Sequence, residues 1–374
     1  MASIAKPQIA SETRSLLVYL TSLFVVSRLV IVAISLAAYN HFQQELDLPW
    51  NEWMTAIWAK WDVSWYTRIA HHGYDAMPFN TLKERSWGFL PLYPMTIKAF
   101  VWLFHTTKFS IVGSLISCAS SFSALWIFIN TFKDRISNRK RFLFLYLASA
   151  GSLYLSIPYA ESLGLLLLAC TFHFTKEKKY WLAAIMAGLA AITRLQLVAL
   201  LLIPLGALLF DPQIRRKILH APVMVALFGI PTLVHMAYLH SLTGNAFAFF
   251  DVQAAWGNPN PYPLESLVVF ILKGIKNPPL QWFHLYIWSL FAAILIRNYK
   301  KIPLNELIFC IVVFLISTGS ERFYAAYRYV LMLIPLYIAL ANEEEWFRNF
   351  YIYSNLILGT MYVIAFVNVY KFSL

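Results

Sequence analysis

The chain has 374 residues, of which 60% are hydrophobic and 13% are charged, and its mean hydropathy is +0.60. This composition excludes an ordinary soluble globular domain. The net charge is +12, but the basic residues form short clusters between apolar runs, so membrane topology explains them and no nucleic-acid partner is indicated. We therefore expect an all-α, polytopic membrane protein.

Apolar runs recur along the whole chain, and a helix needs about 20 apolar residues to cross a bilayer core of about 30 Å. The runs predict about 11 transmembrane helices, several of them short and expected to pair as hairpins. A single domain over 1–374 is the simplest division, because no repeat or linker is visible. The predicted spans are 16–39, 109–132, 142–157, 159–175, 181–193, 195–210, 219–240, 283–297, 303–318, 325–341 and 350–370.

The stretch from Phe89 to His105 is ambiguous, because it is apolar but contains Pro91, Pro94 and Lys98. If it crossed the bilayer, the most basic loop of the chain, 133–141, would fall outside, against the positive-inside rule. We therefore predict that it lies in or dips into the interface.

With that choice every strongly basic loop is cytoplasmic, including the run from Arg215 to Lys217. Two long segments, 40–108 and 241–281, are then extracytoplasmic. The polar and aromatic residues that could carry chemistry gather on this outer side.

Asp62 is the first catalytic candidate, because Trp61, Trp65 and Tyr66 frame its carboxylate. An acidic side chain in an apolar surround is a better general base than one in water. Alternatively, Asp62 caps an interfacial helix whose aromatic face lies among the headgroups.

An ordered set of motifs resembles the GPI mannosyltransferase 2 family of the GT-C glycosyltransferases. The match runs from about Ser27 to Ala341, and no single motif would suffice. The motifs are Trp61 to Tyr74 with its Trp-Asp-x-x-Trp-Tyr start, Phe89 to Pro94, Tyr159 to Leu163, Ala191 to Arg194, Gln253 to Gly257, Tyr327 to Tyr329 and Pro335-Leu336.

The resemblance implies an enzyme that transfers mannose from a polyprenyl-phosphate donor in the membrane to a hydroxyl of a glycolipid or glycan acceptor, with inversion. Asp62 would be the base. The membrane is that of the endoplasmic reticulum or a bacterial plasma membrane, with an extracytoplasmic active face. No cofactor is certain, and a divalent metal ion that bridges Asp62 and the donor phosphate stays open.

Arginine side chains are the first candidates for the leaving phosphate, because guanidinium groups match phosphate oxygens. Arg194 and Arg328 lie at predicted outer helix ends. Alternatively, each forms an ion pair with Glu161 or Glu321.

Two further cations, Arg68 and Lys60, flank Asp62 and are weaker candidates for the donor phosphate, since solvent alone could satisfy them. Arg28 lies deep in the first span, where a lone charge is costly. Its side chain is either structural or lines the lipid-phosphate cavity.

Further outer residues are candidates for contacts with substrate. Glu161 could bind acceptor hydroxyls or orient Arg194, and Gln253 and Trp256 could contact sugar or simply pack the loop. His71 and its neighbour His72 point in different directions on a helix, which disfavours a metal site. The predicted substrate-binding set is Glu161, Trp61, Tyr66, His71, Gln253 and Trp256.

Two rival functions remain open at this stage. One is a GT-C transferase that moves a different sugar. The other is a lipid-linked-sugar transporter without chemistry, which would favour inverted repeats that the sequence does not display.

Overall fold

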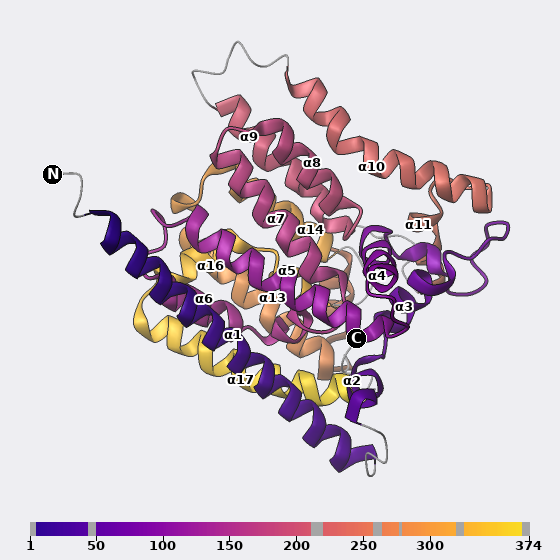
Figure 1. The fold of residues 1–374 in the computed structure, drawn as a ribbon, viewed down its shortest axis with the longest axis horizontal. Helices are drawn as coiled ribbons and strands as arrows, with labels where there is room; N and C mark the ends of the chain where they lie inside the picture. The colour runs from indigo at the N-terminus through magenta and orange to yellow at the C-terminus, as the bar shows by residue number, and fades with distance from the viewer. Residues whose placement is uncertain are drawn as a thin grey trace.

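The computed structural model describes residues 5–43, 50–210, 220–256, 264–276, 279–318 and 325–368, and every regular element in these ranges is a helix (Figure 1). The predicted all-α, polytopic class is therefore confirmed. The basic run from Arg215 to Lys217, and Glu321, lie outside the described residues.

Four described helices are long and apolar enough to cross a membrane. They are α1 (Ala5–Gln43), α5 (Phe109–Thr131), α10 (His220–Thr243) and α17 (Glu345–Val367). The shortest of these has 23 residues, or about 35 Å of helix, which exceeds the hydrocarbon thickness. α1 and α17 lie side by side along one edge of the bundle (Figure 1).

A layer of closely packed helices continues from α5 to α7 (Ala160–Lys176), then to α8 (Tyr180–Ala191) and α10. Small side chains bring these helices together, as is usual where lipid surrounds the bundle. A Cβ atom added at Gly188 of α8 would lie 2.5 Å from the carbonyl oxygen of Phe228 in α10.

Two predicted spans are broken rather than continuous, which corrects the ranges 142–157 and 325–341. Each consists of two shorter helices joined by a turn. The pairs are α6 (Arg139–Leu147) with η2 (Ala150–Leu155), and α15 (Ala326–Val330) with α16 (Ile334–Ala341). The predicted span 195–210 is continuous, because the 3-10 helix η3 (Leu195–Leu201) runs directly into α9 (Leu202–Phe210).

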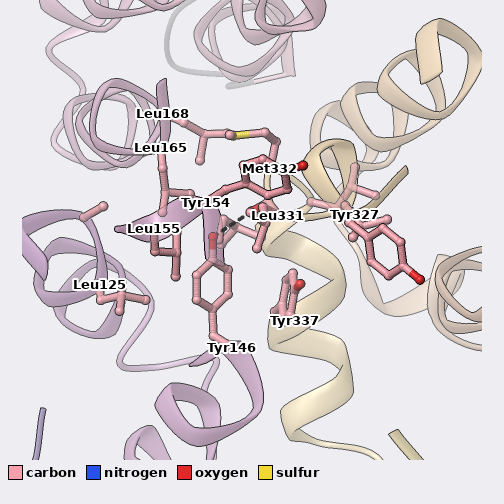
Figure 2. Close-up of a cluster of buried hydrophobic side chains, with 14 of the residues drawn as sticks. Leu125, Tyr146, Tyr154, Leu155, Leu165, Leu168, Tyr327, Leu331, Met332 and Tyr337 are labelled. Atoms are coloured by element: carbon pink, nitrogen blue, oxygen red, sulfur yellow. Dashed lines mark hydrogen bonds between the residues drawn. The ribbon is translucent and has the colours of Figure 1, made fainter. Parts of the chain in front are cut away.

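The breaks persist because the protein satisfies the freed backbone groups. The amide of Ala150 donates to Oδ1 of Asn355 on α17 at 3.0 Å. Between α15 and α16, the carbonyl of Leu331 accepts a hydrogen bond from the Tyr146 hydroxyl at 2.9 Å, and the Tyr337 ring packs 4.6 Å from that of Tyr146 (Figure 2). These buried contacts with Tyr146 thus fix the position of α15 within the helix bundle.

The short helices between α1 and α5 form a compact cap at the end of the bundle. They are α2 (Trp50–Trp58), α3 (Asp62–His72), η1 (Ser86–Gly88) and α4 (Leu92–Leu103). α4 has 12 residues, about 18 Å, which is too short to span. Its Met95 and Trp102 are exposed, as expected of an interfacial helix.

The described part of the segment 241–281 contributes α11 (Ala248–Asp251), η5 (Val252–Trp256), α12 (Glu265–Lys273) and η6 (Gly274–Lys276). α11 contacts η1 of the cap. The remaining described helices are α13 (Pro279–Asn298), η7 (Tyr299–Lys301) and α14 (Leu304–Ser317).

Candidate active site

Four charged side chains from four distant segments meet below the cap. Nη1 of Arg328 lies 2.7 Å from Oδ2 of Asp62. Nε of Arg328 donates to Oε1 of Glu161, and Nη1 of Arg194 lies 3.3 Å from the same Glu161 oxygen. We call these four residues the acid–arginine cluster.

The local structure explains why the two acids stand where they do. Asp62 is the first residue of α3, and Glu161 lies in the first turn of α7. Carboxylates are favoured at helix N-termini, where the backbone dipole is positive. The sequence predicts an apolar environment for Asp62, and the structure corrects this expectation. A cation, Arg328, lies next to the Asp62 carboxylate in addition to the aromatic residues.

Burial differs within the cluster. The Glu161 side chain is fully buried, and those of Arg194 and Arg328 are 13% and 11% exposed. Asp62 is the most accessible member at 23%. The Asp62 carboxylate is therefore the member of the cluster most open to solvent.

Three buried atoms of the cluster have no hydrogen-bond partner among the described residues: Oε2 of Glu161, Nε of Arg194 and Nη2 of Arg328. Buried polar groups are nearly always satisfied in folded proteins, so these atoms are expected to take a partner from outside the chain, such as water, an ion or a ligand. Two guanidinium groups with spare donors can bind an anionic oxygen. A spare carboxylate oxygen can accept from a hydroxyl.

Aromatic rings wall the cluster on the buried side. The guanidinium carbon of Arg328 lies 4.8 Å from the Tyr159 ring centroid and 5.4 Å from that of Tyr154. Tyr66, on α3, packs edge-on at 6.1 Å from Tyr159. Burial raises the pKa of the Tyr66 phenol, so it stays a neutral hydrogen-bond donor at physiological pH.

Tyr154 and Tyr362 stand in none of the motifs found in the sequence, and their hydroxyl groups hydrogen-bond to each other. Tyr159 did stand in a recognised motif, two residues before Glu161. No local pattern distinguishes Tyr362, because it reaches the site from α17 at the far end of the chain.

Lys60 and Trp61, which directly precede α3, bind backbone groups near the end of α17. The Lys60 amine donates to the carbonyl of Val367 and lies 5.1 Å from the Tyr39 ring centroid. Burial lowers the pKa of the Lys60 amine. The Trp61 indole donates to the carbonyl of Phe366 at 3.4 Å. Both hold the start of α3 against the end of α17.

Arg68 and His71 lie away from the cluster. Nη2 of Arg68 forms an ion pair with Oδ1 of Asp75 at 2.6 Å, and its guanidinium lies 5.3 Å from the Trp65 ring centroid. His71 is nine residues beyond Asp62 on α3, a rise of about 13 Å. Its ring packs at 5.0 Å from Phe109.

Gln253 and Trp256 reach the cap from η5. The Trp256 ring centroid lies 5.5 Å from that of Trp65 and 5.7 Å from that of Phe89. Its buried Nε1 has no hydrogen-bond partner among the described residues. The Gln253 amide donates weakly to the Phe249 carbonyl at 3.4 Å. Gln253 and Trp256 therefore lie beside the aromatic residues of the cap, and no contact with the acid–arginine cluster is seen for them among the described residues.

Arg28, which the sequence left undecided, has a structural role. Its guanidinium donates to the carbonyl and hydroxyl oxygens of Ser152 and to the Ser156 hydroxyl at 2.8 Å. These contacts join α1 to the broken α6–η2 segment. A charge deep in α1 is tolerated because it satisfies backbone and hydroxyl groups that the break exposes.

Within the described residues, no group of three or more His, Cys, Asp or Glu side chains is arranged to hold a metal ion. Glu161 contacts both arginines of the cluster and Asp62 contacts one. The two arginines of the cluster are suited to bind an anion at this site.

The fold is similar to one solved structure, that of ArnT from Cupriavidus metallidurans bound to undecaprenyl phosphate, with a TM-score of 0.51 and 13% identity. The alignment covers 91% of this chain and 63% of ArnT, so this chain spans less than two thirds of that protein. At this identity the likeness shows that the two chains share a fold. No protein-family model and no curated protein matches the chain.

Proposed function

We propose that this protein is a membrane-embedded inverting glycosyltransferase that uses a polyprenyl-phosphate sugar. The single observation that carries the proposal is the acid–arginine cluster, in which an accessible carboxylate stands beside two buried guanidinium groups with spare donors. The fold supports it, because the similar structure of ArnT holds undecaprenyl phosphate.

The chemistry needs one base and one anion site. The acceptor hydroxyl oxygen attacks the anomeric carbon, its proton passes to Asp62, and the bond between that carbon and the phosphate oxygen breaks. Polyprenyl phosphate leaves with the bonding electrons, and its growing negative charge is stabilised by Arg328 and Arg194. Glu161 acts through these arginines, since it holds both.

Among the cations near Asp62, Arg328 and Arg194 are the phosphate-binding pair. Arg68 is already paired with Asp75, and Lys60 with the end of α17. Tyr66 and Trp256 are proposed to contact the sugar or the acceptor, because both rings pack against Phe89 near the cluster.

Mannose is the proposed sugar, and a glycolipid or glycan hydroxyl is the proposed acceptor. Both rest on the ordered motifs that resemble the GPI mannosyltransferase 2 family. We further propose that the cluster faces the lumen or periplasm, because this orientation leaves the basic loop 133–141 in the cytoplasm.

The test uses purified protein, polyprenyl-phosphate-mannose and a panel of glycolipid acceptors. Wild type should release polyprenyl phosphate only when a suitable acceptor is present. Asp62→Asn should bind the donor normally and transfer about 10²–10⁴ times more slowly. The matched control is Glu84→Gln, an exposed acid of the same outer segment, which should be fully active.

Three outcomes separate the alternatives. Full activity of Asp62→Asn would remove this residue from the mechanism. Turnover only with another polyprenyl-phosphate sugar would keep the reaction and correct the donor. Movement of the lipid-linked sugar across a vesicle membrane without glycosidic bond formation would replace the enzyme with a transporter.

A further inference from the structure

A second charged feature lies at the opposite end of the bundle from the acid–arginine cluster. It is a groove of about 560 Å³ between the start of α1 and the loop that joins α5 to α6. Its α1 wall ends at Leu16, whereas Tyr39, near the other end of α1, contacts Lys60 of the cap. The 23 residues between Leu16 and Tyr39 correspond to about 35 Å of helix, so the groove is a separate site.

The groove is basic. Its described lining contains three cationic side chains, Lys133, Arg139 and Lys140, against one acid, Glu12. Arg139 is ion-paired with Glu12, so the two lysines supply the excess positive charge. Both lysines are exposed, and the Lys140 amine lies 5.2 Å from the Tyr19 ring centroid.

The backbone adds to the positive electrostatic potential in the groove. Asn138 is the N-cap of α6, its side chain accepts from the amide of Arg141, and it lines the groove with the first two residues of the helix. The positive end of the α6 dipole therefore points toward the same space as the lysines, an arrangement that favours anions.

The position of the groove at the membrane boundary indicates the source of the anion. Leu16 is the last α1 residue in the groove, and the next two, Leu17 and Val18, are 40% and 58% exposed. These exposed apolar side chains lie near the start of the candidate span Ser11–Phe42, where a helix that crosses a membrane would meet lipid. An anion at the lysines would thus lie at headgroup depth, directly above the first acyl-chain contacts of α1.

We propose that this groove binds the phosphate headgroup of an anionic phospholipid in the leaflet opposite the acid–arginine cluster. The bound lipid joins α1 to the α5–α6 loop. The volume of the groove lies within the range of sites that bind small ligands. Hydroxyl groups in its lining, including that of Ser15, can complete the hydrogen bonding of a phosphate.

The test compares the affinity of purified protein for phosphatidylglycerol and for phosphatidylcholine in a neutral detergent. Bound lipid is counted by native mass spectrometry and checked by the shift in the thermal unfolding midpoint. The test variant is the double substitution Lys133→Gln and Lys140→Gln. The control is Lys300→Gln and Lys301→Gln, which removes the same charge from another basic loop outside the groove.

Wild type should retain phosphatidylglycerol in preference to phosphatidylcholine and should unfold at a higher temperature with it. The groove variant should bind it about 25-fold more weakly, roughly fivefold for each lysine near an anionic lipid, while the control keeps wild-type affinity. Equal retention of the two lipids, or equal losses in both double variants, would overturn the proposal. Saturation by inorganic phosphate alone, with no added effect of lipid, would instead assign the groove to a soluble anion.

Discussion

Arg328 touches both acids of the site: its Nη1 lies 2.7 Å from Oδ2 of Asp62, and its Nε donates to Glu161. A buried guanidinium shared by two carboxylates is held in place more firmly than one with a single partner. In the proposed reaction, a donor phosphate bound to Arg328 would compete with Asp62 for this cation and would leave the carboxylate free to accept a proton.

Arg328→Gln is expected to lower the transfer rate by about 10²–10³, because one oxyanion-stabilising donor is lost. Arg328→Lys should recover only part of it, since an ammonium group cannot reproduce the two-sided geometry. Single-turnover kinetics with saturating donor would check this. A wild-type rate in Arg328→Lys would show that only the charge matters.

Glu161→Leu is expected to destabilise the protein by about 3–5 kcal/mol, because it leaves Arg194 buried without its acid. The double variant Glu161→Leu and Arg194→Met should recover much of this stability while remaining inactive. Thermal unfolding and transfer assays would be measured on the same preparations. Additive losses of stability in the double variant would contradict a direct interaction between the two side chains.

Gly151→Ala is expected to impair the site from a distance. An added Cβ would lie 2.3 Å from the Tyr327 carbonyl oxygen, so η2 and α15 must move apart, and we expect Arg328 on α15 to be displaced. Gly229→Ala on α10 is the control, since nothing lies within 4 Å of its added Cβ. We expect a lower midpoint of unfolding and at least a tenfold loss of transfer, as a 1 Å misplacement can cost about 10²-fold. The control should be neutral or slightly stabilising.

The proposed orientation predicts which loops a membrane-impermeant thiol reagent can reach in intact cells or sealed vesicles. In a background with Cys118, Cys170 and Cys310 replaced by Ala, Glu84→Cys should be labelled from the outer side. Lys140→Cys should react only after permeabilisation, and both positions are exposed. Labelling of both from the same side would refute the topology.

How the four charges meet could be predicted only in part. Asp62, Glu161, Arg194 and Arg328 were each candidates from the sequence, and the pairing of Glu161 with Arg194 was among the alternatives. The link from Arg328 to Asp62 could not be predicted, because it depends on the depth at which the core holds α15. The roles of Lys60 and Arg68 depended in the same way on partners that sequence spacing does not reveal.

Hydropathy and charge by themselves determined that the chain is an all-α membrane protein, because lipid demands long apolar helices whatever their packing. Only the tertiary structure decided where helices break and which charges pair. A break is stable when distant groups satisfy the backbone, as Asn355 does for Ala150. A buried arginine is stable when distant oxygens surround it, as Ser152 and Ser156 surround Arg28. These partners lie on other helices, so packing rather than local sequence selects them.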